Sequence, residues 1–318
     1  SFTFTDHINS FITDRDFVQH KNIKISKNQT HFKDEELNFL IQNNEPFKVL
    51  INVHDNETFK SSLRIFHKAF KSNIELKITT FYYRIFLLFS QLWNLENNCS
   101  YLHSSAVEVN GKSIVFTADS GVGKSALLFR LSAEKGFKFI ADDLTIISSD
   151  MKAFYQGRCL SVKPYHLSFF PFLKTKLRTL MGSVQSLQWS LIKDNRLTFR
   201  ISPTDIFDEI NEQSTIKSII HLCNHTTDRF EIKDISVKEL LDYTIPIFSN
   251  ELFLAHHKLN TLASLPNSPL ISSSEMLKKT ENIYTSAFKN ISLKLVLVPY
   301  KSNPNDLYEF LKKEGCLN

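Results

Sequence analysis

Three short segments near the start of the chain have β-rich character: hydrophobic and polar positions alternate at residues 22–26 and 75–79, and residues 48–53 are mainly apolar. The three segments, which polar turns separate, predict strands, and the pattern then changes to a helical spacing. From Phe81 to Leu95 apolar residues recur three or four positions apart, and most positions between them are also apolar. This pattern predicts a helix that is buried on several sides.

A second region begins after the polar run that follows this helix, so we expect an N-terminal α+β region at residues 1–98 and a second domain at 99–318. Asn110 and Gly111 separate two apolar runs, a strong signal for a β-hairpin because both central positions of a type I′ turn need positive φ. The apolar spacing then predicts a helix at residues 126–131, closed by Lys135 and Gly136.

A short apolar strand at residues 137–141 ends at two aspartates, and residues 144–148 continue extended. Strand, loop, helix, strand and acid is the order of a phosphate-binding α/β core. Further along, the patterns predict strands at 216–222 and 293–298, a helix at 237–243, and a helix at 304–314 capped by Asn303 or Asn305.

The loop between the hairpin and the next helix matches the template Gly-x-x-x-x-Gly-Lys-Ser/Thr, with Ala118 in place of the first glycine. Its glycines let backbone N–H groups wrap around a phosphate at the positive end of the helix. Lys124 is expected to reach the β and γ phosphates, and the Ser125 hydroxyl to bind Mg²⁺. The predicted nucleotide-binding residues are Asp119, Ser120, Gly121, Val122, Gly123, Lys124, Ser125 and Ala126.

Asp142 and Asp143 supply the two acids that phosphoryl transfer to a hydroxyl requires, one to hold a metal and one to orient or deprotonate the acceptor. We assign Asp142 as the base and Asp143, with Ser125, as a metal ligand. Both carboxylates reach one site only if the strand ends there, because successive residues of a strand point to opposite sides. A structural turn or capping pair is the alternative.

His103 lies on the strand before the phosphate loop, and this position makes it a candidate catalytic residue. A hydrogen-bonded, partly buried histidine is the alternative. After the aspartates, Arg158 and Lys163 are candidates for contact with the transferred phosphate or the acceptor. Later cations among aromatic residues either attract an acidic acceptor or cover the edge of a core: Lys174, Lys176 and Arg178.

The elements Leu102-His103, Asp119 to Ser125, and Lys135 to Asp143 together resemble the kinase core of the HPr kinase/phosphorylase family. The resemblance covers about residues 100–150. It implies a phosphate-loop fold related to phosphoenolpyruvate carboxykinase, a serine hydroxyl as acceptor, metal binding and acid–base work by the aspartates, and a histidine near the transferred phosphate. No counterpart of that family's Glu-Ile-Arg-Gly-Leu-Gly-like signature follows. The chain therefore looks like a divergent member, similar to serine kinases of peptide-modification pathways.

The overall prediction is an α/β, ATP- and Mg²⁺-dependent kinase that phosphorylates a hydroxyl, most simply a serine of a peptide or protein. The alternatives are a small-molecule hydroxyl kinase, acting on a sugar, nucleoside or amino acid, and a nucleotide-binding regulator without transfer chemistry. Thirty-eight Lys and Arg against 33 Asp and Glu is too weak a bias for a nucleic-acid binder. Four scattered cysteines and no long apolar segment predict a cytoplasmic protein that does not enter a membrane. Self-association stays open.

Overall fold

Two structural units make up this mixed α/β chain. One consists of Ser1–Trp93 with Leu252–Lys278, and the other of Asn94–Glu251 with Lys279–Asn318. The computed structural model describes residues 2–5, 8, 18–20, 23–26, 29–33, 37–42, 48–53, 73–181, 189, 198–252, 260–265, 268, 270–300 and 302–318. Within those residues no helix has the length and apolar character needed to cross a membrane.

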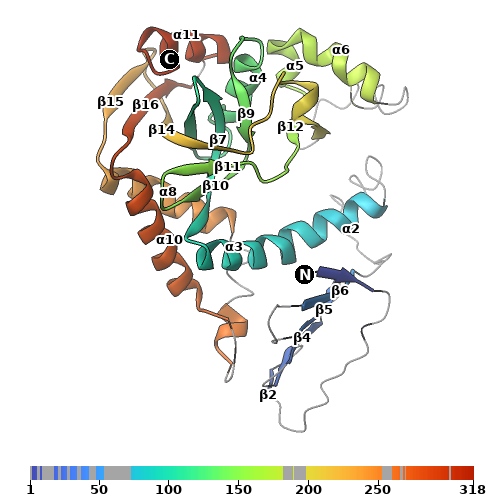
Figure 1. Ribbon diagram of the computed structural model, residues 1–318. Helices are drawn as coiled ribbons and strands as arrows, with labels where there is room; N and C mark the ends of the chain where they lie inside the picture. The colour runs from blue at the N-terminus through green and yellow to red at the C-terminus, as the bar shows by residue number, and fades with distance from the viewer. Residues whose placement is uncertain are drawn as a thin grey trace. The chain divides into compact units, whose positions relative to one another are not determined.

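The first unit contains a six-stranded sheet in the order β1-β6-β5-β4-β3-β2, in which only β1 and β6 run parallel (Figure 1). Its strands are β1 (Phe2–Phe4), β2 (Val18–His20), β3 (Ile23–Ile25), β4 (Gln29–Lys33), β5 (Leu37–Gln42) and β6 (Lys48–Val53). The predicted strands at 22–26 and 48–53 are confirmed as β3 and β6. Alternate apolar residues of β3, β5 and β6 form one buried cluster together with Ile85 and Leu262.

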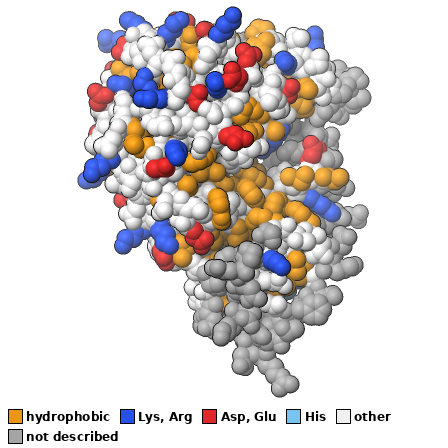
Figure 2. Space-filling view, viewed as in Figure 1, with side chains coloured by type: hydrophobic (Ala, Val, Ile, Leu, Met, Phe, Trp, Pro, Cys, Tyr) orange, Lys and Arg blue, Asp and Glu red, His pale blue; other side chains and the backbone are white. Residues whose placement is uncertain are grey.

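A helical run follows: α2 (Asn73–Phe81), a π-helical turn (Tyr82–Phe86) and α3 (Leu87–Glu96). The helix predicted from Phe81 to Leu95 is confirmed, but the strand predicted at 75–79 is wrong. Ile74 and Ile78, 69% and 56% exposed, stand one helical turn apart, and the Thr79 hydroxyl donates to the Glu75 carbonyl at 2.7 Å. The alternation there did not mark a buried strand face, and the helix begins eight residues earlier than predicted. Figure 2 shows hydrophobic side chains over this helical run.

Residues 252–278 belong to the first unit, although the predicted boundary after residue 98 placed them in the second domain. Leu262 is 1% exposed within the cluster just described, and Leu265 and Leu270 pack against that cluster. The sequence does not reveal this return, because the contacts join residues about 180 positions apart.

The second unit is built on a larger sheet in the order β11-β10-β7-β8-β14-β16-β15, with β9 also paired to β7 and β11 also paired to β14. Strands β8, β14 and β16 run parallel, and β7 is antiparallel to β8. The strands are β7 (Cys99–Val109), β8 (Lys112–Ala118), β9 (Lys138–Ala141), β10 (Leu144–Ser148), β11 (Lys152–Phe154), β14 (Gln213–His225), β15 (Glu231–Asp234) and β16 (Ser292–Pro299). A separate pair joins β12 (Leu160–Val162) to β13 (Phe199–Ile201).

Helices cover this sheet, with α4 and α11 above it and α8 and α10 below it in the view of Figure 1. Arg130 of α4 lies 3.8 Å from the ring centre of Tyr308 of α11. Tyr284 of α10 is fully buried and donates its hydroxyl hydrogen to the Tyr101 carbonyl on β7. The helices are α4 (Lys124–Leu131), α5 (His166–Phe169), α6 (Pro171–Leu180), a 3₁₀ turn (Pro203–Asp205), α8 (Val237–Glu251), α10 (Ser273–Phe288) and α11 (Pro304–Lys313).

Most predicted elements of this unit are present. The hairpin is β7–β8, with Asn110 at φ 52° and Gly111 at φ 77°, and the distant predictions correspond to β14, β16, α8 and α11. Asn303 caps α11 by accepting from two backbone N–H groups. The predicted closure of α4 by Lys135 and Gly136 is wrong: the helix stops at Leu131, where the Ser132 hydroxyl donates to the Phe129 carbonyl at 2.9 Å. Gly136 lies in the turn beyond it.

Candidate active site

The predicted phosphate loop joins the end of β8 to the start of α4. Ala118 is the last residue of β8 and is fully buried, so a small side chain fits where the template has glycine. Gly121 and Gly123 have φ of 89° and 115°, a conformation that side-chain-bearing residues rarely adopt. Because the first N–H groups of α4 have no partner within the helix, this turn directs backbone donors and the positive helix end to one place.

The two aspartates lie at an interruption in one strand. β9 and β10 pair with successive parts of the same strand, β7, so Asp142 and Asp143 stand between two collinear segments. Asp143 has φ 72°, and the Leu144 N–H donates to the Asp142 carbonyl at 2.9 Å, which makes a γ-turn. This turn breaks the alternation of the strand and lets both carboxylates take part in one site.

Asp142 is the buried member of the pair, at 3% exposure. Its Oδ1 accepts hydrogen bonds from Ser105 on β7 at 2.7 Å and from Ser125 on α4 at 2.9 Å. Burial and the nearby Asp143 carboxylate raise the pKa of Asp142 above its usual value. The structure thus pairs Ser125 with Asp142, whereas the prediction from the sequence groups Ser125 with Asp143 as metal ligands.

Lys124 and His103 face one another beneath the loop. The Lys124 ammonium donates to the carbonyls of Ala118 and Asp119 at 2.9 and 3.1 Å, and lies 2.9 Å from His103 Nε2. Burial and the Lys124 charge lower the pKa of His103 to about 4, and burial lowers the pKa of Lys124 to about 8. His103 is therefore neutral near pH 7. Since an ammonium only donates, Nε2 accepts and the ring proton lies on Nδ1.

Asp143 extends to the other side of the site, with its side chain 44% exposed. Arg158, which is buried, forms an ion pair with Asp143. Although burial opposes a charge on Asp143, the Arg158 guanidinium holds the pKa of Asp143 below its usual value. The candidate Arg158 thus joins the site. Lys163 donates its backbone N–H to His166 Nδ1 at 3.0 Å, and no described contact brings its side chain to the aspartates.

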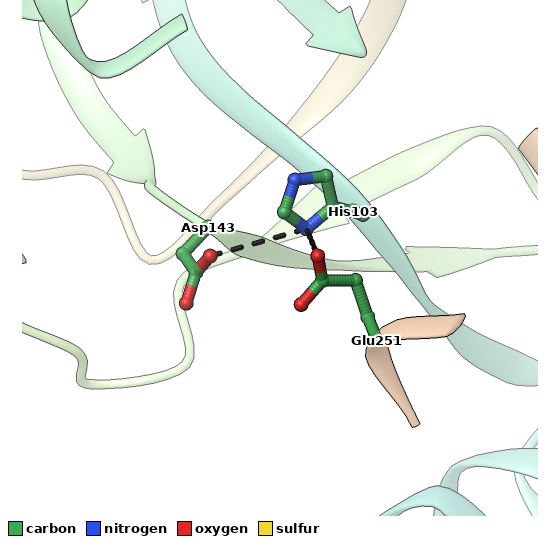
Figure 3. Close-up of side chains that lie close together, drawn as sticks. All are labelled: His103, Asp143 and Glu251. Carbon is green, nitrogen blue, oxygen red and sulfur yellow. Dashed lines mark ion pairs between the residues drawn. The ribbon is translucent and has the colours of Figure 1, made fainter. Parts of the chain in front are cut away.

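Glu251, the last residue of α8, lies in the candidate site although it was not predicted from the sequence. Its Oε1 accepts from the Ser120 hydroxyl at 3.2 Å and lies 3.7 Å from His103 Nδ1, while Asp143 Oδ1 lies 3.9 Å from the same nitrogen (Figure 3). Desolvation and Asp143 raise the pKa of Glu251. More than 100 residues separate Glu251 from the aspartates, and no motif surrounds it, so no sequence signal marked it.

The remaining predicted residues are also accounted for. Asp119 accepts the Ser120 backbone N–H at 2.7 Å, which fixes the start of the loop. Val122 is partly exposed in the loop, and Ala126 is buried on α4. On α6, Leu173 and Leu177 are buried whereas the cations are exposed: Lys174, Lys176 and Arg178.

Two groups of side chains bear on metal binding. His103 Nδ1, Asp143 and Glu251 have potential ligand atoms within 4.8 Å of one another. A cation on Nδ1 would force the ring proton onto Nε2, which would then face the Lys124 ammonium as a second hydrogen-bond donor. These three residues therefore do not suit a metal while Lys124 stays beside His103. Ser125 and Asp142 instead offer two oxygen atoms 2.9 Å apart beside the loop, the ligand type that Mg²⁺ prefers.

Comparison with known proteins adds little to this picture. No protein-family model matches the chain, and no curated protein matches it. Among solved structures, it is similar to the HPr(Ser) kinase/phosphatase from Coxiella burnetii, with 10% identity and a TM-score of 0.32. The match covers 68% of this chain and 97% of that chain. A likeness this weak does not establish a shared fold, so function must be inferred from the site itself.

Proposed function

We propose that this protein is a Mg²⁺-dependent kinase that transfers the terminal phosphate of ATP to a hydroxyl, most simply a serine of a peptide or protein. One observation supports it above the others: the positive-φ loop ahead of α4 brings Lys124 and Ser125 to an aspartate pair on another strand. A loop match alone arises by chance. Its convergence with Asp142, Asp143 and Arg158 is the arrangement that phosphoryl transfer needs.

The site fits a nucleotide with its metal. The backbone of Gly121 to Ala126 would hold the phosphates, and the Lys124 ammonium, still held by His103, would contact the terminal phosphate in place of its loop carbonyls. Ser125 and Asp142 would hold Mg²⁺, which neutralises charge on the phosphate oxygens. This assignment moves the metal-side role from Asp143 to Asp142, because Asp142 bonds Ser125 and is too deeply buried to meet an acceptor.

The protein's own side chains divide the remaining work. Arg158, positioned by Asp143, is a second cation among the described residues of the site and can stabilise negative charge on the phosphoryl group as it moves. His103 holds Lys124 through Nε2 and keeps that ammonium at the loop. A peptide serine as acceptor rests on the family resemblance of residues 100–150, and the experiment below compares it with small molecules.

The test is replacement of Lys124, with Lys135 as a matched control. Lys124→Ala removes the cation that compensates developing phosphoryl charge, a contribution of roughly 3 kcal/mol, or about a hundredfold in rate. Lys135 lies only eleven residues away, is exposed, and has no place in the site, so Lys135→Ala should behave as wild type.

Labelled ATP would be offered with Mg²⁺, a serine-peptide library and a panel of sugars, nucleosides and amino acids. The proposal is supported if wild type phosphorylates a peptide and Lys124→Ala does not. Transfer to a metabolite alone would instead indicate a small-molecule hydroxyl kinase. Undiminished turnover in folded Lys124→Ala protein would refute the loop as donor site. Tight MgATP binding without transfer to any acceptor would indicate a nucleotide-binding regulator without transfer chemistry.

A further inference from the structure

Among the residues that the structure describes, four carboxylates surround the phosphate loop, and three of them already have other partners. Asp142 is buried and accepts two serine hydroxyls. Asp143 is neutralised by the Arg158 guanidinium, which lowers its basicity. Asp119 accepts the backbone N–H of its neighbour Ser120. A base for the acceptor needs an oxygen that an incoming hydroxyl can reach and a carboxylate that no cation neutralises.

Glu251 meets both requirements. Its side chain is 30% exposed, so part of the carboxylate faces solvent, and its described partners are neutral: the Ser120 hydroxyl and the His103 ring. Desolvation raises its pKa, the direction that makes a carboxylate a better proton acceptor. The two nitrogens of His103 separate Glu251 from Lys124, so the carboxylate stands one imidazole ring away from the cation expected to hold the terminal phosphate.

We infer that Glu251 is a catalytic residue, the general base that takes the proton of the acceptor hydroxyl. This inference rests on the proposed kinase function. In the step, the acceptor O–H bond breaks and its proton passes to the Glu251 carboxylate, while the acceptor oxygen forms a bond to the terminal phosphorus. The bond from that phosphorus to the bridging oxygen breaks, and ADP leaves with the electron pair. Asp143 then acts as a positioning residue for Arg158.

The serine side chain on the loop supports this placement. The Ser120 hydroxyl donates to Glu251 Oε1 at 3.2 Å, which ties the end of α8 to the phosphate loop and leaves Oε2 for another contact. The geometry also explains why a residue so distant in the sequence reaches the site: β7 and β8 both contact α8, whose final turn ends at the loop.

The experiment compares Glu251→Gln with Asp143→Asn and with Asp242→Asn, an exposed acid on the same helix. Glutamine keeps an oxygen for the Ser120 hydroxyl but is not a base. The probes are water and a pool of serine-containing peptides with γ-labelled ATP and saturating Mg²⁺. ATP affinity is measured separately by calorimetry, and the rate is followed from pH 5 to pH 9.

We expect Glu251→Gln to lower turnover by about 10²- to 10⁴-fold while its ATP dissociation constant stays within about threefold of wild type. The acidic limb of the rate profile should disappear in this variant and persist in Asp242→Asn, which should transfer at the wild-type rate. A role limited to holding Ser120 would instead weaken ATP binding and leave the shape of the profile unchanged.

Three results would overturn the inference. Glu251→Gln with near-wild-type turnover would show that no proton passes to this residue, and a rate loss explained wholly by ATP affinity would reduce it to a structural contact. Retained turnover in Glu251→Gln with a large loss in Asp143→Asn would move the base to Asp143. In each case wild type still transfers phosphate, and the kinase proposal stands; wild type that binds MgATP but transfers to neither probe overturns both.

Discussion

Acid should destabilise the second unit through His166, whose buried ring packs against the helix that follows the phosphate loop. The ring centre lies 4.9 Å from that of Phe129 on α4, and Nδ1 accepts the Lys163 backbone N–H at 3.0 Å. Burial, with a smaller effect of the Lys163 charge, lowers the pKa of His166 from its ordinary value of 6.5 to about 3. The folded protein therefore keeps this ring neutral where the unfolded chain protonates it.

The sign and size follow from linkage. Because the folded pKa lies below the unfolded one, the stability is fully present above pH 6.5 and is lost as the pH falls toward 3. A pH of 5 lies about 1.5 units below the pKa of the ring in the unfolded chain. At roughly 1.4 kcal/mol per unit, the free energy of unfolding should fall by about 2 kcal/mol. His166→Asn keeps an acceptor for the Lys163 N–H but does not titrate in this range.

The measurement is urea unfolding at pH 7.5 and pH 5. Hydrogen exchange of peptides from α4 serves as the probe, so that unfolding of the second unit is observed separately. His103 and His221 also have lowered pKa values, but they titrate equally in both proteins, so the difference between variant and wild type isolates His166. The variant should lose about 2 kcal/mol less on acidification than wild type does. Equal losses in the two proteins would refute the reasoning.

Two further predictions concern the metal and the acceptor. Asp142→Asn should weaken ATP affinity and flatten its dependence on Mg²⁺, because the carboxylate beside Ser125 is lost; calorimetry over a Mg²⁺ series that matches wild type would contradict the metal-side placement. Neutral replacements of Lys174, Lys176 and Arg178 should raise KM for the acceptor at low salt and converge with wild type as salt rises, since these exposed cations act through screened contacts. Unchanged acceptor kinetics at low salt would leave these cations as ordinary solvated surface.

The parts of the fold that local chemistry determines were predictable from the sequence. The turn at Asn110 and Gly111 needs positive φ at two residues, and the loop needs it at positions 121 and 123. Both features can be predicted because Asn and Gly are residue types that tolerate such angles. The strands and helices around them followed from apolar spacing. The prediction of a strand at residues 75–79 was wrong because alternation over five residues fits a strand and one exposed helical turn equally well.

The composition of the candidate site was predictable only where its residues were close in the chain. The sequence predicts Asp142 and Asp143 as site residues, but which of them contacts Ser125 depends on the γ-turn at Asp143, and no residue type there indicates such a turn. Glu251 reaches Ser120 from 131 residues away, through the packing of α8 on the sheet. Such long-range contacts are set by how whole elements pack, which one sequence does not disclose.

The position of β16 in the sheet has a consequence for the order in which this protein can fold. β16 lies between β14 and β15, yet it is synthesised about 60 residues after both of them. Until residues 292–299 leave the ribosome, one edge of β14 lacks its neighbour, and an unpaired strand edge is open to pairing with other chains. The nascent chain therefore carries its phosphate loop well before the sheet beneath it is complete, and chaperone contact during synthesis would fall in that interval.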